Sequence, residues 1–212
     1  MLYYILRPLM WLFYKICYPI KIFGKENVVK KGKRIVICNH LCKMDVFVVG
    51  ALYPDKTYFL SKIEWWDNKF FGWLISKLGA IPLDRDKPSI STIKTALGVL
   101  KKEKRLGIFP EGRRNFDTND LQEIKQGTAM FAFKGQAPIT TVIINDRLKP
   151  FRKNYAIVGE SFDFSEYYGE KFNGEVSDKC TQIIADHMKE LQSKLNTLIE
   201  EEKSKKKSKK SK

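Results

Sequence analysis

Short apolar runs alternate along the chain with segments in which apolar residues recur every three to four positions. The runs are predicted strands, and the clearest of them is Ile139 to Ile144. The periodic segments are predicted helices, because this spacing places their apolar side chains on one face. Further strands are expected at 34–38, 58–60, 80–83, 106–109 and 155–158, and helices at 46–49, 65–78, 90–100, 127–134 and 177–199. The alternation predicts an α/β fold with a mixed, largely central sheet covered by helices.

The first 23 residues form an apolar, aromatic segment that is interrupted by charge. Arg7 and Lys15 would each cost roughly 2.5–3.5 kcal/mol at the centre of a membrane-spanning helix, so a span is not expected. Pro8 and Pro19 bracket about one short helix. Aromatic rings mixed with cations suit the lipid headgroup layer, and residues 1–23 are therefore predicted to be an amphipathic helix lying in the membrane surface. The alternative is an amphipathic helix docked on the protein's own core.

The rest of the chain divides into a globular domain and a short basic tail, because its composition changes near residue 203. Residues 24–202 are expected to form one globular domain, because 212 residues are few for two. Residues 203–212 contain seven lysines and three serines, which is typical of a disordered basic tail. Such a tail attracts anionic lipid, by about 1 kcal/mol per lysine near the surface, or it serves solubility alone.

Composition and charge limit the partners, the location and the metal sites that are expected for this protein. The net charge of +15 favours anionic partners, but much of the excess lies in the tail and no nucleic-acid-binding motif appears, so nucleic acid is not an expected partner. The four cysteines show no disulfide framework, which favours a reducing, cytosol-facing location. Cys38, His40 and Cys42 alternate, but a structural zinc site needs four ligands and no second Cys/His pair stands nearby. No metal site is expected.

The most informative residues are His40 and Asp45, which follow the predicted strand 34–38. A neutral imidazole takes up a proton near pH 7, and a carboxylate on its other nitrogen fixes the tautomer and stabilises the imidazolium. The pair therefore predicts a general base with its own orienting carboxylate. An aspartate at the start of an apolar run also serves as a helix cap, and the two roles are compatible. The other histidine, His187, lies on the apolar stripe of the last predicted helix and is expected to be a packing residue.

Arginines follow two other predicted strands. Arg85 comes after the strand that ends at Leu83, and Glu111, Gly112 and Arg114 come after the strand that ends at residue 109. Ligands collect at the carboxyl ends of the strands in open α/β sheets. A guanidinium donates two parallel hydrogen bonds to a phosphate, and a glycine lets the backbone approach a ligand. We therefore expect a base that acts on a hydroxyl group of a molecule held by its phosphate.

Four short sequence blocks stand out along the chain, and two of them precede residue 90. The first is an Asn-His-x4-Asp block formed by Asn39, His40 and Asp45. The second is a glycine followed by an apolar strand and an arginine, at residues 79–85. An Asn-His-x4-Asp block alone is common by chance, so its significance depends on the blocks that follow.

The third block is Phe-Pro-Glu-Gly-Arg-Arg at 109–114, and the fourth is an apolar-Pro-apolar strand that begins at 137–139, preceded by Lys125 and Gly127. In this order the blocks resemble the motifs of the glycerophospholipid acyltransferases, specifically the 1-acylglycerol-3-phosphate acyltransferase group. The resemblance covers about residues 30–145, most of the predicted globular domain.

The chain departs from the family motifs at two positions. Arg113 stands where the third motif has threonine, and Cys42 stands where family members often have serine. Both departures bear on acceptor preference more than on the type of reaction. Cys42 is close to His40 in sequence, but two residues along a tight turn rarely face each other, and the family needs no acyl-enzyme. A covalent role for Cys42 is therefore not expected.

The resemblance implies an acyltransferase domain at 24–202 with a glycerolphosphate acyltransferase-like fold. It implies that His40 is the catalytic base and that Asp45 keeps it competent. It also implies a set of substrate-binding residues. These are Arg85 and Arg114 for the acceptor phosphate, Lys62 as a weaker candidate, Gly112, and Glu111, which is expected to orient one of the arginines.

The implied reaction transfers an acyl group from acyl-CoA or acyl-carrier protein to the free hydroxyl of 1-acylglycerol 3-phosphate, making phosphatidic acid for phospholipid synthesis. No cofactor is implied, because a thioester is a good acyl donor without a metal. Acylation of glycerol 3-phosphate or another lysophospholipid is one alternative, and a non-catalytic membrane-surface lipid-binding protein is another. The expected location is peripheral or monotopic on the cytoplasmic face of the membrane. The expected partners are lysophosphatidate, an acyl thioester and the anionic membrane surface, with acyl-carrier protein as a further candidate.

Overall fold

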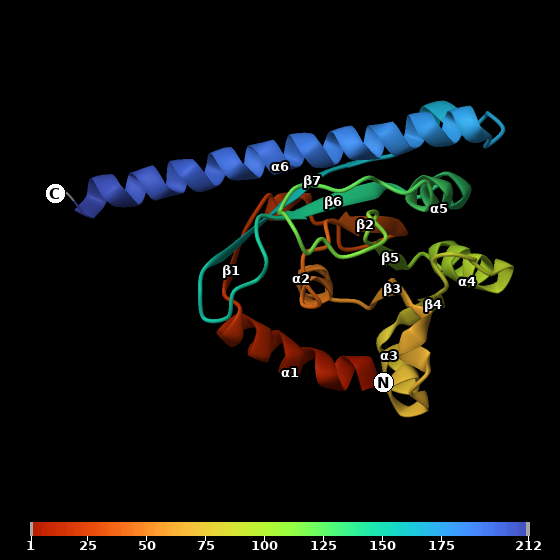
Figure 1. Ribbon diagram of the computed structural model, residues 1–212, viewed down its shortest axis with the longest axis horizontal. Helices are drawn as coiled ribbons and strands as arrows, with labels where there is room; N and C mark the ends of the chain where they lie inside the picture. Colours follow the sequence, from red (N-terminus) through yellow and green to blue (C-terminus); the bar gives the residue numbers. More distant parts are fainter. Residues whose placement is uncertain (1, 211–212) are drawn as a thin grey trace.

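A seven-stranded mixed sheet lies at the centre of the computed structural model, which describes residues 2–210 and their side chains to residue 208 (Figure 1). The strands follow the order β1-β7-β6-β2-β5-β3-β4 across the sheet. Neighbours are parallel except β6 and β7, which are antiparallel. The strands are β1 (Ile20–Phe23), β2 (Arg34–Cys38), β3 (Thr57–Lys62), β4 (Ala80–Leu83), β5 (Arg105–Ile108), β6 (Ile139–Ile144) and β7 (Asn154–Phe162). The predicted α/β fold is confirmed.

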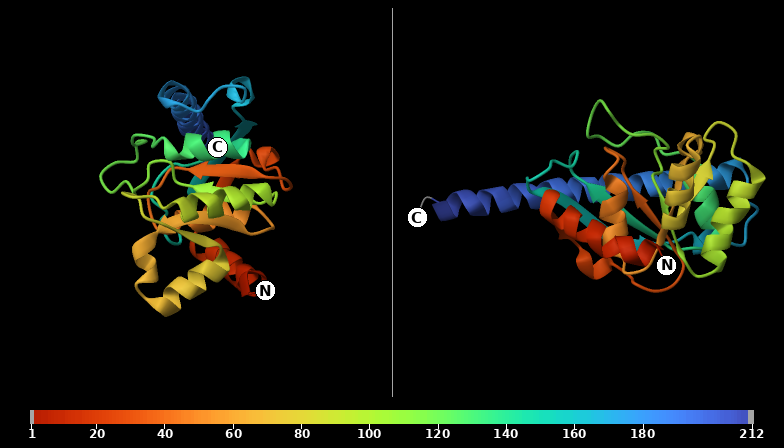
Figure 2. Two further views of the ribbon diagram at one scale, coloured as in Figure 1. Left: turned by 90° about the vertical axis from the view of Figure 1, so that its right-hand side faces the viewer. Right: turned by 90° about the horizontal axis from the view of Figure 1, so that it is seen from below.

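Helices cover both faces of the sheet (Figures 1 and 2). Helices α4, α5 and α6 pack on one face around the larger cluster of buried apolar side chains, and α1 and α2 pack on the other face around a smaller one. Helix α3 contacts α1 and β4. The helices are α1 (Leu2–Cys17), α2 (Asp45–Leu52), α3 (Lys69–Leu78), α4 (Ile90–Lys101), α5 (Gly127–Gly135) and α6 (Gly174–Lys210), with short 3-10 helices η1 (Lys25–Asn27), η2 (Ile63–Trp66) and η3 (Ser165–Tyr167).

Burial and capping explain why these elements form. Every residue of β2 and β6 is buried, as expected for apolar runs in strands that are covered on both faces. The hydroxyl of Ser89 accepts a hydrogen bond from the backbone of Thr92 and caps α4. Gly79 has a φ of +108°, a left-handed conformation that suits glycine, and it ends α3.

The first 23 residues contain a strand as well as the expected helix. Helix α1 ends at Cys17, and Ile20–Phe23 forms β1, an edge strand that pairs with β7. The carbonyl of Pro19 accepts a hydrogen bond from the backbone of Asn154, which fixes the start of this pairing. The division follows from Pro19, whose lack of a backbone N–H does not suit a continuing helix. Met1 lies outside the described residues.

Helix α1 docks on the body through its polar and aromatic side. Tyr14 is buried in the smaller core cluster, and Arg7 donates a hydrogen bond to the carbonyl of Tyr53. The opposite side of the helix exposes large apolar side chains, namely Ile5, Leu9, Leu12, Phe13 and Ile16. The helix is therefore packed against the protein and also carries an unpartnered apolar face. No helix within residues 2–210 combines the length and the apolar character that a membrane span requires.

The segment predicted as one helix at 65–78 is divided in two. Ile63–Trp66 forms η2, and α3 begins only at Lys69. Asn68 causes the break, because its side chain accepts a hydrogen bond from the backbone of Phe71 and caps α3.

The basic end of the chain is helical where disorder was expected for 203–212. Helix α6 continues to Lys210 and projects beyond the sheet (Figure 1), whereas residues 211–212 lie outside the described residues. Extending an existing helix needs no new nucleus, and lysine is a fair helix former. Glu202 supports this end of α6 through ion pairs with Lys21 at 2.5 Å, with Lys206 at 3.4 Å, and with Lys153. Hydrogen bonds from Lys153 and Lys21 lower the pKa of Glu202 to about 2.

The parallel strands bring the predicted site residues to one edge of the sheet. Strands β2, β3, β4 and β5 are parallel neighbours, so their carboxyl ends share an edge. His40 follows β2, Arg85 follows β4 and Arg114 follows β5. The sheet therefore gathers side chains that are up to 74 residues apart in sequence.

Candidate active site

The turn between β2 and α2 holds His40 against Asp45. The His40 Nδ1 atom lies 3.0 Å from Asp45 Oδ2, and the Asp45 side chain is fully buried. The same oxygen accepts hydrogen bonds from the backbone N–H groups of Leu41 and Cys42, each at 2.7 Å. With Nδ1–H donating to the carboxylate, Nε2 carries the free lone pair. The arrangement orients the imidazole and leaves Nε2 as the nitrogen that can accept a proton.

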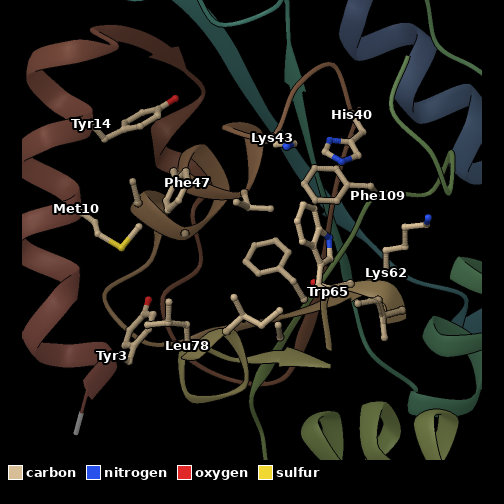
Figure 3. Close-up of a pocket in the computed structure, with 18 of the residues that line it drawn as sticks. Tyr3, Met10, Tyr14, His40, Lys43, Phe47, Lys62, Trp65, Leu78 and Phe109 are labelled. Atoms are coloured by element: carbon tan, nitrogen blue, oxygen red, sulfur yellow. The ribbon is translucent and has the colours of Figure 1, made fainter. Parts of the chain in front are cut away.

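Two further contacts fix the His40 ring and the strand that precedes it. Phe109 stacks on the imidazole with ring centres 4.0 Å apart (Figure 3). Asn39 bonds both backbone groups of Ile144, donating to the carbonyl at 2.9 Å and accepting from the N–H at 2.8 Å. These bonds tie the end of β2 to β6, so the turn that carries His40 starts from a fixed point.

A cavity of about 420 Å³ opens in front of His40, between α1, α2, α3 and the ends of β3 and β4. Figure 3 shows His40 and Phe109 at one end and Tyr3 and Leu78 at the other. Most of the wall is apolar or aromatic, and it includes Met10, Tyr14, Phe47, Trp65 and Leu78. Four cationic side chains, Lys43, Lys62, Arg85 and Arg114, line the wall together with His40, and Arg7 and Tyr3 of α1 add polar groups to it.

Arg85 and Arg114 line this cavity together with His40, as the sequence predicts. Burial lowers the pKa of Arg85, the charge of Glu64 acts in the opposite direction, and the neighbouring charge of Arg114 lowers the pKa further. In the part of the chain that the structure describes, neither guanidinium forms an ion pair or a hydrogen bond; Arg114 lies over the ring of Phe116. Lys62 also lines the cavity but is paired with Glu64. Two neighbouring guanidinium groups that form no ion pair among the described residues are available to bind an anion.

Glu111 and Gly112 lie behind the site rather than in it. The sequence predicts that Glu111 orients an arginine, but its Oε1 instead accepts a hydrogen bond from the His40 backbone N–H at 3.2 Å. The Glu111 residue is 2% exposed, and burial raises the pKa of its carboxyl to about 7. Gly112 has a φ of +69° and does not line the cavity, so glycine is needed there for the turn. Neither residue is placed to touch a ligand in the cavity.

Arg113 and Cys42, the two residues that depart from the family motifs, lie in different surroundings. Arg113 points away from the cavity and donates from Nε to Gln122 at 3.1 Å. The Cys42 thiol donates to Asp45 Oδ1 at 3.1 Å, so it supplies the hydrogen bond that a serine hydroxyl would supply. Burial and the charge of Asp45 raise the pKa of Cys42 to about 11, which keeps it a thiol at neutral pH. Cys42 therefore supports the carboxylate and is not an activated nucleophile.

Lys43 and Asn115 were not selected from the sequence, although Lys43 lines the cavity and Asn115 contacts His40. Lys43 lines the cavity beside His40, with its ammonium 5.3 Å from the centre of the Trp65 ring. The backbone N–H of Asn115 donates to the His40 carbonyl at 2.8 Å. A lysine three positions after the histidine was a visible signal, whereas the Asn115 contact depends on the path of a loop. His187 is far from this chemistry and stacks on Phe162.

The described residues offer no obvious metal centre. Within residues 2–210, no three His, Cys, Asp or Glu side chains gather closely enough to hold a metal ion. The alternating Cys38, His40 and Cys42 make other contacts instead of forming a metal site. The Cys38 thiol donates a hydrogen bond to Asn39, and the Cys42 thiol donates one to Asp45.

Known proteins resemble this chain in sequence and in fold. The 1-acyl-sn-glycerol-3-phosphate acyltransferase of Bacillus subtilis (strain 168) is 29% identical over 185 residues, which cover 84% of this chain and 91% of that protein. The protein of that name from Cocos nucifera is 31% identical over 201 residues, covering 89% of this chain and 63% of that protein. The chain thus spans most of the bacterial relative and under two thirds of the plant one.

A solved structure supports the fold. The crystal structure of the 1-acyl-sn-glycerophosphate (LPA) acyltransferase PlsC from Thermotoga maritima matches with a TM-score of 0.66 and 21% identity, covering 91% of this chain and 79% of that one. At this identity the likeness concerns the architecture alone. The family model described as Acyltransferase matches residues 19–145, more than half of the chain, and these residues include His40, Asp45, Arg85 and Arg114. The chain therefore belongs to the acyltransferase family.

Proposed function

We propose that this acyltransferase moves an acyl group from a thioester to the free hydroxyl of 1-acylglycerol 3-phosphate, making phosphatidic acid. One observation carries the proposal: a buttressed imidazole and two arginines that form no ion pair among the described residues line one largely apolar cavity. This arrangement suits a molecule with a hydroxyl, a phosphate and an acyl chain. Relatives named 1-acyl-sn-glycerol-3-phosphate acyltransferase support the choice of acceptor.

In the proposed mechanism, His40 is the general base. Its Nε2 removes the proton from the acceptor hydroxyl as the oxygen attacks the thioester carbonyl. Asp45 accepts the Nδ1–H bond and stabilises the imidazolium that forms. Positioned proton transfer of this kind contributes about 10²–10⁴-fold to the rate.

The bond changes balance without a resident cofactor or metal. A C–O ester bond forms at the acyl carbon, the C–S bond breaks, and the leaving thiolate takes the proton that His40 removed. The thioester is itself an activated donor, so acyl-CoA and acyl-carrier protein both meet the chemical requirement. We propose one of these two as the acyl donor.

Arg85 and Arg114 are the proposed phosphate ligands. Two guanidinium groups offer paired donors to a phosphate, and their mutual repulsion is relieved when an anion lies between them. Lys62 contributes less, because it is already paired with Glu64. The apolar walls contributed by α1, α2 and α3 receive acyl chain.

The outer faces of α1 and α3 are the proposed membrane contact. Both helices lie on the same side of the molecule, away from α6 (Figures 1 and 2). Their exposed large apolar side chains include Leu9 and Phe13 on α1 and Phe70 and Trp73 on α3. Such a surface suits a peripheral or monotopic protein whose cavity opens toward lipid. The net charge of +15 favours an anionic leaflet, and we propose the cytoplasmic face.

An acceptor panel tests the proposed function. Purified protein and its His40→Ala variant are supplied with acyl-CoA or acyl-carrier protein and with lysophosphatidate, glycerol 3-phosphate or lysophosphatidylcholine. We expect fastest transfer to lysophosphatidate and almost none by the variant. Preference for another acceptor would change the substrate but keep the reaction. Vesicle binding with no product from any acceptor would favour a lipid-binding role, and equal rates for the two proteins would remove His40 from the mechanism.

A further inference from the structure

The loop between β5 and α5, residues 109–126, holds His40 from three directions. Phe109 stacks on its ring, Glu111 accepts its backbone N–H, and the backbone of Asn115 donates to its carbonyl. The same loop carries Arg114, one of the two proposed phosphate ligands. The position of the base is therefore set by the loop that contacts the acceptor.

Among the side chains of this loop, Glu111 is the one whose position substrate binding explains least. It does not line the cavity, and no arginine pairs with it. Its second carboxyl oxygen is buried and has no hydrogen-bond partner among the described residues. Burying such a group is unfavourable, so a function is expected from its hydrogen bond to the His40 backbone.

We propose that Glu111 is a positioning residue that acts through the backbone amide of His40 and couples the phosphate-binding loop to the base. Its hydrogen bond to the His40 N–H and the bond from Asn115 to the His40 carbonyl hold the backbone on both sides of the His40 Cα. Acceptor phosphate held by Arg114 then sits at a fixed distance from Nε2. The inference rests on the proposed function, in which His40 is the base and Arg114 binds phosphate.

The strength of this link changes with pH. Burial and the nearby charge of Asp45 raise the pKa of Glu111 to about 7, while the backbone amides of His40 and Gln122 act in the opposite direction. The titratable groups that face it are Asp45, His40 and Cys38, and the Cys38 thiol is itself held protonated by burial. An ionised carboxylate accepts a stronger hydrogen bond than a neutral carboxyl. The link therefore tightens as the pH rises through neutrality.

Kinetics separate positioning from substrate binding. Glu111→Ala removes the acceptor of the His40 N–H, and we expect kcat to fall by up to about 10²-fold with the acceptor KM changed less than about twofold. Glu111→Gln keeps an acceptor oxygen and should restore most of the lost kcat at pH 6, where the native carboxyl is largely neutral. Arg114→Ala should instead raise the acceptor KM. Glu123→Gln is the matched control, because its carboxylate belongs to the same loop, is exposed and pairs with Lys125.

A second measurement does not depend on activity. The side-chain carboxyl carbon of Glu111, identified by its absence from the Glu111→Gln spectrum, should titrate near pH 7 in the folded protein rather than near 4.5. When kcat is measured over the same range of pH, it should rise near pH 7 in the native protein. The Glu111→Gln variant should lack this rise. Thermal unfolding of each variant establishes that it is folded.

The outcomes distinguish this inference from the proposed function. A native protein that acylates no acceptor overturns the proposed function. An active native protein whose Glu111→Ala variant raises KM and keeps kcat overturns the inference alone, because Glu111 would then act on the substrate. Folded, fully active Glu111→Ala, or a Glu111 carboxyl that titrates near 4.5, would also overturn it.

Discussion

At the level of single residues, one carboxylate both folds the catalytic turn and orients the imidazole. Asp45 Oδ2 takes two backbone N–H groups and the His40 ring, while Oδ1 takes the Cys42 thiol. These four donors satisfy the two oxygens of a fully buried side chain. Substitutions around this carboxylate therefore change the geometry of the base as well as its charge.

Asp45→Asn should lower acyl transfer by about 10²–10⁴-fold. The amide is neutral and can present an NH₂ group to the His40 ring, which favours the wrong tautomer. The measurement is the initial rate with saturating lysophosphatidate, alongside the unfolding temperature. Asp186→Asn, on exposed α6, is the control. A folded Asp45→Asn protein that keeps the native rate would show that the carboxylate is dispensable.

Cys42→Ser should retain the native rate or exceed it. A serine hydroxyl makes the same hydrogen bond to Asp45 Oδ1 and is a better donor than a thiol. Rate assays and intact-protein mass spectrometry after mixing with acyl-CoA provide the check. An inactive serine variant, combined with an acyl adduct on native Cys42, would instead establish a covalent intermediate.

Glu111→Gln should stabilise the protein at high pH and not at low pH. The pKa of Glu111 is about 7 when folded and about 4.5 when unfolded, so the unfolded chain ionises first as the pH rises. The resulting penalty on the native fold is absent below about pH 4.5, grows up to about pH 7 and is full above it. Unfolding temperatures at pH 5 and pH 8 should show the gap between variant and native protein widening. A constant gap would mean that the native carboxyl does not titrate in this range.

At the level of elements, the apolar outer face of α1, which we propose as a membrane contact, is separate from the face that packs on the body. Arg7 and Tyr14 join the helix to the protein, whereas Leu9 and Phe13 are 63% and 56% exposed. Charges placed on the outer face therefore leave the fold intact.

The double variant Leu9→Glu/Phe13→Glu should bind vesicles much less than the native protein. It loses apolar insertion and gains repulsion from anionic lipid. Co-sedimentation with phosphatidylglycerol-containing vesicles measures binding, and detergent-dispersed substrate measures the activity that should remain. Ile90→Glu is the control, because Ile90 is an exposed apolar residue on α4, across the sheet. Unchanged binding would exclude α1 as the contact.

The elements that the sequence missed depend on distant partners or on local caps. Strand β1 has only four residues, and its partner β7 begins 134 positions after β1 begins, so nothing near Ile20 signals the pairing. The break before α3 was visible in principle, since Asn68 is a common cap. The His40–Asp45 pair was predictable because both residues lie in one turn. The Glu111–His40 bond was not, because it depends on how a loop 71 residues away folds back.

At the level of the whole molecule, cations and apolar groups lie on different sides. The apolar faces of α1 and α3 lie on one side of the sheet and α6 lies on the other (Figure 2). The lysines of α6 beyond Glu202 project past the body. Their attraction to a bilayer under α1 acts over a distance and is therefore sensitive to salt.

Deleting residues 203–212 should weaken vesicle binding at 20 mM salt and have little effect at 300 mM salt. The Debye length shortens from roughly 20 Å to under 10 Å over this range, so distant charges are screened. The α1 double variant should stay defective at both salt concentrations. Vesicle co-sedimentation at the two concentrations compares them. A deletion effect that persists in high salt would place the lysines in direct contact with lipid.

The stack of Phe109 on His40 has a consequence for how the two substrates must meet. Together with the bond to Asp45, it prevents the imidazole from swinging between two sites. In the proposed mechanism, a single nitrogen then takes the proton from the alcohol and gives it to the departing sulfur. The hydroxyl oxygen and the sulfur must therefore both come within reach of Nε2, so the acyl donor and the acceptor have to occupy the site at the same time.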